Sequence, residues 1–131
     1  MPLKEATLLK GKPSSAIVAV RDLGPAREFY GETLGLEAES DDEDMIEFRT
    51  GETRLVVYVS DFAGSNKANA AVWNGGGDFD AIVGQLRDRD VVFEEYPELG
   101  MDIANGVHSS GGFKGVWFKD PDGNVLHVTN M

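Results

Sequence analysis

The chain has 131 residues, 41% of them hydrophobic and 27% charged, and this composition predicts one globular domain over residues 1–131. There is no cysteine, which excludes disulfides, thiolate metal sites and cysteine nucleophiles. With 12 basic and 23 acidic residues the net charge is −11, so the chain repels nucleic acid and anionic membranes, and the sequence has no basic cluster to offset this. The charge suits a cationic small molecule, or serves solubility alone.

No apolar run is long enough to span a membrane. Residues 1–13 contain lysines but only a brief apolar patch, which is not the pattern of a secretory signal. We therefore expect a cytoplasmic protein.

A β-α-β-β-β unit is predicted over residues 15–60. Proline near the first position of a helix and glycine just past its end delimit a helix that opens at Gly24-Pro25 and stops at Gly35. The strands of this unit are expected at residues 15–20, 36–40, 45–49 and 54–60.

The same order of elements recurs over residues 69–129. Setting residue 15 on residue 69 also sets Phe29 on Val83, which predicts an architectural repeat. The second helix begins near Asp78 with an apolar stripe at Phe79, Ile82, Val83 and Leu86. Its strands are expected at residues 69–73, 91–95, 115–119 and 125–129.

Residues 97–114 interrupt the second unit. This segment is rich in Gly, Ser and Asn, and so long a connection in a compact domain is typical of a lid or binding loop. His108 lies within it and is expected to be solvated, although a loop histidine can also swing into a site.

Two motifs stand in order along the chain. The first is Val20-Arg21-Asp22-Leu23 followed by Glu28-Phe29-Tyr30 and Leu34-Gly35-Leu36. The second is the hairpin sequence from Val116 to Asn124, with the turn Asp120-Pro121-Asp122-Gly123. Together they resemble the vicinal oxygen chelate superfamily, which includes glyoxalase I, extradiol dioxygenases and bleomycin-resistance proteins. The resemblance covers residues 15–129. It implies an α+β fold of two βαβββ modules, about 15–60 and 69–129, whose curled mixed sheets enclose a ligand cavity, often within a homodimer.

The resemblance also gives positions for a divalent metal, and these fall on Ser15, Asn69 and His127. Only the imidazole of His127 binds a transition metal well, and one imidazole does not make a site. We therefore predict no metal and no other cofactor. His127 is then a histidine that lines the cavity or is hydrogen-bonded within the fold.

Strand alternation and the same resemblance indicate which other side chains face the cavity. Arg54 and Tyr58 are expected to point inward from the first module, and Trp73 and Trp117 from the second. Aromatic walls stack on planar or cationic ligands. The alternative for both tryptophans is that they pack the interior.

The sequence thus favours metal-independent binding of a small, possibly cationic aromatic ligand, as in bleomycin-resistance proteins that sequester their drug. The ligand-binding set is Ser15, Arg54, Tyr58, Asn69, Trp73, Trp117 and His127. One alternative is a lyase, isomerase or dioxygenase with atypical metal ligands, or with His127 as a general base. The other is a purely structural dimeric module.

Overall fold

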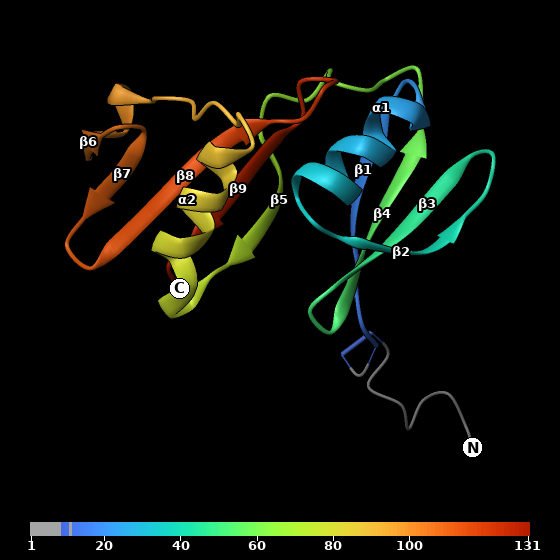
Figure 1. Ribbon diagram of the computed structural model, residues 1–131, viewed down its shortest axis with the longest axis horizontal. Coiled ribbons are helices and arrows are strands. Elements are labelled where there is room, and N and C mark those ends of the chain that lie inside the picture. Colours follow the sequence, from blue (N-terminus) through green and yellow to red (C-terminus); the bar gives the residue numbers. More distant parts are fainter. Residues whose placement is uncertain (1–8, 11) are drawn as a thin grey trace.

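The computed structural model describes residues 9, 10 and 12–131 and contains two β-sheets, each with a helix packed on one face (Figure 1). The expectation about a secretory signal concerns residues 1–13, most of which lie outside this described part. Within the described residues, no helix is long and apolar enough to cross a membrane.

The first module forms a four-stranded sheet with the order β1-β4-β3-β2, in which β1 and β4 are parallel and the other pairs antiparallel. The side chain of Asp22 caps the helix by accepting a hydrogen bond from the Gly24 N–H at 2.9 Å. The elements are β1 (Ala16–Val20), α1 (Leu23–Glu28) continued by a π-helical turn (Phe29–Thr33), β2 (Glu37–Asp41), β3 (Met45–Thr50) and β4 (Thr53–Val59).

The second module forms a five-stranded sheet with the order β5-β9-β8-β7-β6. The apolar stripe predicted for its helix faces the sheet: Phe79, Val83 and Leu86 are buried. The elements are β5 (Asn69–Asn74), a 3₁₀ turn (Gly76–Asp78), α2 (Phe79–Asp88), a second 3₁₀ turn (Pro97–Leu99), β6 (Asp102–Ala104), β7 (Val107–Ser110), β8 (Phe113–Lys119) and β9 (Val125–Thr129).

One strand expected in the second module was wrong. Residues 91–95 are not a strand: the edge of β8 is occupied by β7 along residues 113–115. Within the described residues the segment makes one backbone hydrogen bond to β8, from the Glu94 N–H to the Trp117 carbonyl at 2.7 Å, beside the ion pair of Glu94 with Lys119. The insertion at residues 97–114, expected to be a lid or binding loop, contains the β6–β7 hairpin that widens the sheet.

The turn motif after β8 joins the two modules. Asp120 is buried and accepts the phenolic hydrogen bond of Tyr30 at 2.7 Å. The side-chain amide of Asn124 donates to the Ala19 carbonyl at 2.7 Å and to Asp120 at 2.8 Å. The hairpin of the second module is therefore hydrogen-bonded to the helix and first strand of the first module.

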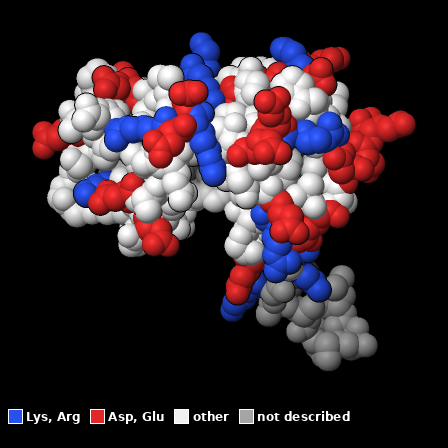
Figure 2. Space-filling view, viewed as in Figure 1, with Lys and Arg blue, Asp and Glu red and all other residues white. Residues whose placement is uncertain are grey.

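The predicted α+β fold of two modules is confirmed: the first is βαβββ, and the second is βαβββ-like, with β6 and β7 in place of the one strand expected after its helix. The sheets are not closed into a barrel: β2 and β6 are free edges in the described chain. Acidic and basic side chains are interspersed on the face seen in Figure 2, with no continuous basic patch there.

Candidate functional site

The sheet face opposite α2 carries an aromatic cluster centred on Trp117. Trp117 on β8 is paired in register with His127 on β9, and the two rings stack with centroids 4.0 Å apart and planes inclined by 12°. The indole Nε1–H donates to Asn69 Oδ1 at 3.2 Å. Gly115 makes room for the imidazole, because a Cβ there would lie 2.8 Å from Cε1 of His127.

Hydrogen bonding sets the tautomer of His127. Its Nδ1 lies 2.8 Å from the carbonyl oxygen of Val116, which can only accept, so Nδ1 carries the proton and Nε2 keeps its lone pair. Burial lowers the pKa of His127, and the nearby His108 lowers it further, against the opposing effect of the Val116 bond. The ring is therefore a neutral base near pH 7.

The expectation of a solvated His108 was wrong. The side chain lies on β7 and is fully buried, with its ring 4.8 Å from that of Trp117 in an edge-to-face arrangement. Its Nε2 accepts from the Tyr96 N–H at 2.9 Å, so Nδ1 is the donor to the Gly106 carbonyl at 3.2 Å. His108 thus ties the hairpin to the segment before it.

A hollow of about 390 Å³ opens beside this cluster. Tyr96, which packs edge-on against the indole with ring centroids 5.6 Å apart, forms part of its wall. Trp117 is only 7% exposed, because His127 covers one face of its indole and His108 and Tyr96 pack edge-on against it. A ligand in the hollow therefore meets the Tyr96 ring and a small part of the indole surface. The full lining is Lys67, Asn69, Tyr96, Glu98, Leu99, Trp117 and Val125.

Three predicted site residues lie in the first module, away from this cluster. Ser15 precedes β1 and is exposed. Arg54 on β4 is ion-paired with Glu39 at 2.8 Å, and Tyr58, on the same strand, is 37% exposed. None of the three lines the hollow beside the Trp117 cluster described above. Arg54 and Trp73 are brought together elsewhere, because both line a separate hollow between β4 and β5.

The expectation that Trp73 shares the open face was wrong. A β-bulge between Asn69 and Ala71 shifts the register of β5, and Trp73 then pairs with Val128, whose side chain is in the core beneath α2. The indole therefore lies on the helix side of the sheet, where its Nε1–H donates to Thr50 Oγ1 at 2.9 Å.

The three positions at which the family resemblance places metal ligands do not form a metal site in this structure. Ser15 belongs to the other module, and Asn69 Oδ1 already accepts the Trp117 hydrogen bond. Among the residues that the structure describes, no group of three or more His, Cys, Asp or Glu side chains is placed to hold a metal ion. Of the three positions, only His127 has a ring nitrogen, Nε2, that makes no hydrogen bond to the described residues.

Comparison with known proteins gives one family. The model of the Glyoxalase/Bleomycin resistance protein/Dioxygenase superfamily matches residues 12–128. No curated protein sequence matches the chain significantly.

Solved structures share the fold at low identity. A glyoxalase/bleomycin resistance protein/dioxygenase from Alicyclobacillus acidocaldarius is 19% identical with a TM-score of 0.70, over 91% of this chain and 90% of that one. The bleomycin-binding protein of Streptomyces verticillus is 23% identical with a TM-score of 0.67, over 91% and 95%. A lactoylglutathione lyase from Agrobacterium tumefaciens is 17% identical with a TM-score of 0.67, over 91% and 92%.

Proposed function

Because the chain belongs to the Glyoxalase/Bleomycin resistance protein/Dioxygenase superfamily, we propose that it binds and sequesters a small aromatic organic ligand without a metal. The observation that carries the proposal is the hollow beside Trp117, with a wall of fixed aromatic rings. The bleomycin-binding protein of the same fold gives a precedent for binding by a protein of this kind.

The aromatic wall of the hollow and the net charge of the chain indicate which kind of ligand fits. The rings of Tyr96 and Trp117 offer stacking and cation–π contacts, and Asn69 offers a polar group beside them. Glu98 lies at the same hollow as Lys67, so their charges offset locally, but the net charge of −11 attracts cations over a longer range. A cationic aromatic molecule fits these features best.

A charge reversal at the hollow tests this proposal. Glu98→Lys should weaken binding of benzyltrimethylammonium about fivefold at low salt, since a unit charge has been inverted near the ligand. Glu28→Lys on α1 is the matched control, because it changes the net charge equally on an exposed residue that does not line the hollow. Isothermal titration measures both. Equal affinities in the two variants would contradict a ligand at this hollow.

An enzymatic function is the second candidate. The observation that favours it is the neutral His127, whose Nε2 lone pair makes no hydrogen bond within the described chain. The ring is buried behind Trp117 and does not line the hollow, so it serves as a base only if a substrate reaches it. A general base of this kind would abstract a proton from a bound substrate. If wild type turns over a bound substrate and His127→Gln binds it equally well without turnover, the protein is an enzyme.

We also propose a homodimer, formed through the open sheet faces. Ile17 on β1 and Val72 on β5 are 59% and 53% exposed, and Tyr58 is exposed on the same side. The sheet edges are less suited to pairing: β2 is exposed throughout and carries three acidic residues, and β6 is three residues long.

A further inference from the structure

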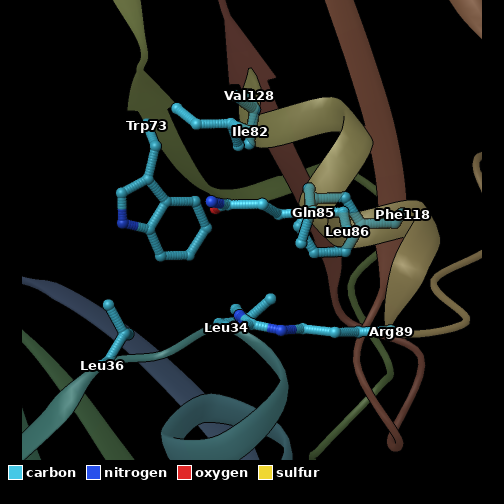
Figure 3. Close-up of a pocket in the computed structure, with 9 residues that line it drawn as sticks. All are labelled: Leu34, Leu36, Trp73, Ile82, Gln85, Leu86, Arg89, Phe118 and Val128. Carbon is cyan, nitrogen blue, oxygen red and sulfur yellow. The ribbon is translucent and has the colours of Figure 1, made fainter. Parts of the chain in front are cut away.

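A second cavity lies at the junction of the two modules, on the helix side of the sheets (Figure 3). Its volume is about 190 Å³, and both modules contribute to it. Leu34 and Leu36 from the first module form one wall, and Trp73 with residues of α2 forms the other. The full lining is Leu34, Leu36, Trp73, Ile82, Gln85, Leu86, Arg89, Phe118 and Val128.

The walls suit a small apolar ring. Seven of the nine lining residues are hydrophobic, and Phe118 and Val128 on the sheet are almost fully buried. A cavity of roughly 150 Å³ with aliphatic and aromatic walls is large enough for benzene. One six-membered ring therefore fits here, with little space for a second.

The cavity is held open by fixed side chains. The Trp73 indole is anchored by its hydrogen bond to Thr50 Oγ1, across the module junction. Arg89 is anchored too, because its Nη1 donates to the Thr33 carbonyl at 3.1 Å, which holds the guanidinium beside the wall formed by Leu34. Both anchors join the second module to the first, so the cavity exists only while the modules are docked.

The polar groups at the cavity favour an anion. In a chain with 23 acidic residues, no acidic residue lines this cavity, and its one charged residue is Arg89. No carboxylate of the described residues forms a salt bridge with that guanidinium. Gln85 adds an amide that points toward the same space in Figure 3.

We propose that this junction cavity binds a single-ring aromatic carboxylate, with the ring between Trp73 and Leu36 and the carboxylate on Arg89. It is distinct from the hollow beside Trp117, which lies on the opposite face of the second sheet. A ligand bound here contacts both modules and therefore stabilises their docking.

The test uses the two tryptophans separately. Trp117→Phe leaves Trp73 as the only tryptophan, so a change in fluorescence reports on the junction cavity. Benzoate should change that fluorescence saturably, whereas benzylamine should not. In the wild type, benzoate should raise the melting temperature, and this second measurement stands if Trp117→Phe does not fold.

Matched variants locate the site. Arg89→Gln should weaken benzoate binding about tenfold, through loss of a charge-assisted hydrogen bond. Lys114→Gln removes the same charge from an exposed residue outside the cavity and should leave binding unchanged. Leu36→Phe should abolish binding by filling the cavity, and Leu99→Phe at the other hollow should not. No saturable response to benzoate, or equal binding by Arg89→Gln and Lys114→Gln, would overturn the proposal without affecting the one for the hollow beside Trp117.

Discussion

At the scale of single residues, the two family motifs are hydrogen-bonded to each other. Asp120 accepts from Tyr30 at 2.7 Å, from the N–H groups of Asp122 and Asn124, and from the Asn124 side chain. Burial, and next the charge of Asp120, raise the pKa of Tyr30 well above its usual range, so the phenol stays a donor. The motifs therefore identify the contact that docks the modules.

Tyr30→Phe tests this contact. Removing the hydroxyl takes one of four donors from a buried carboxylate and should cost about 1–3 kcal/mol of unfolding free energy. Tyr58→Phe removes a hydroxyl that makes no hydrogen bond within the described chain and should cost almost nothing. Urea denaturation of the two variants measures the difference, and equal stabilities would show that the docking contact contributes little.

His127 should make stability depend on pH. Its pKa in the folded protein is below the ordinary value of 6.5, so the unfolded state binds more protons in the interval between them. Its contribution to stability is therefore complete above pH 6.5 and declines as the pH falls toward the folded pKa. Denaturation at pH 7.5 and 5.5 should show that the free energy of unfolding falls more in wild type than in His127→Gln as the pH is lowered. An NMR titration placing the His127 pKa above 6.5 would refute the assignment.

The sequence located part of the candidate site because β8 and β9 are regular strands. Alternation along them places Trp117 and His127 on one face, and Asn69 joins them from β5. The same alternation predicted the wrong face for Trp73. The bulge after Asn69 shifts the register of β5 by one residue, and a one-residue shift moves a side chain to the other face of a sheet. No glycine or proline in β5 signals the bulge.

At the scale of elements, the β6–β7 hairpin builds the wall behind Trp117. Its turn is Asn105-Gly106, both with positive φ, a pair that favours two-residue hairpin turns. This dipeptide was the signal that residues 97–114 contain a hairpin and that His108 lies on a strand. The Arg87 guanidinium binds the Asn105 carbonyl and lies 5.3 Å from the Phe93 ring centroid, so α2 also holds the hairpin.

Substituting two turn glycines separates backbone strain from steric crowding: Gly106 lies in the turn between β6 and β7, and Gly111 in the turn between β7 and β8. Gly106 has φ of +82°, and a Cβ there would lie 2.8 Å from the Cβ of Phe93. Gly111 has φ of +59° with nothing within 4 Å. Gly111→Ala should therefore cost only the strain, about 1–2 kcal/mol, and Gly106→Ala more than that. Denaturation measures both, and equal losses would mean that Phe93 moves aside freely.

At the scale of the whole molecule, the repeat of β-α-β-β-β order predicted the first module and the second module apart from its β6–β7 hairpin. Each unit has an amphipathic helix and strands whose apolar positions cover it, and that pattern is local. The junction cavity was not predictable, because it depends on how side chains distant in sequence, such as Leu36 and Trp73, come together when the modules dock.

A charged residue introduced on the open sheet face tests the proposed dimer. Ile17→Glu should shift the equilibrium toward monomer, because a carboxylate is costly to bury in an interface. Val92→Glu is the control, since Val92 is 76% exposed and lies in the segment after α2. Sedimentation velocity at micromolar concentration measures both. A wild-type monomer under these conditions, or dimers of equal strength in both variants, would contradict an interface on this face.

The most direct test of the central claim is a fluorescence titration of Trp73→Phe, in which Trp117 is the only tryptophan. Benzyltrimethylammonium, its neutral analogue benzyl alcohol and anionic benzoate are compared in the presence of a metal chelator, at low and high salt. The account predicts saturable quenching of Trp117, strongest for the cation, weaker at high salt and unaffected by the chelator. Quenching that requires an added divalent metal, or no response to any of the three, would contradict metal-independent binding of a small aromatic ligand at this site.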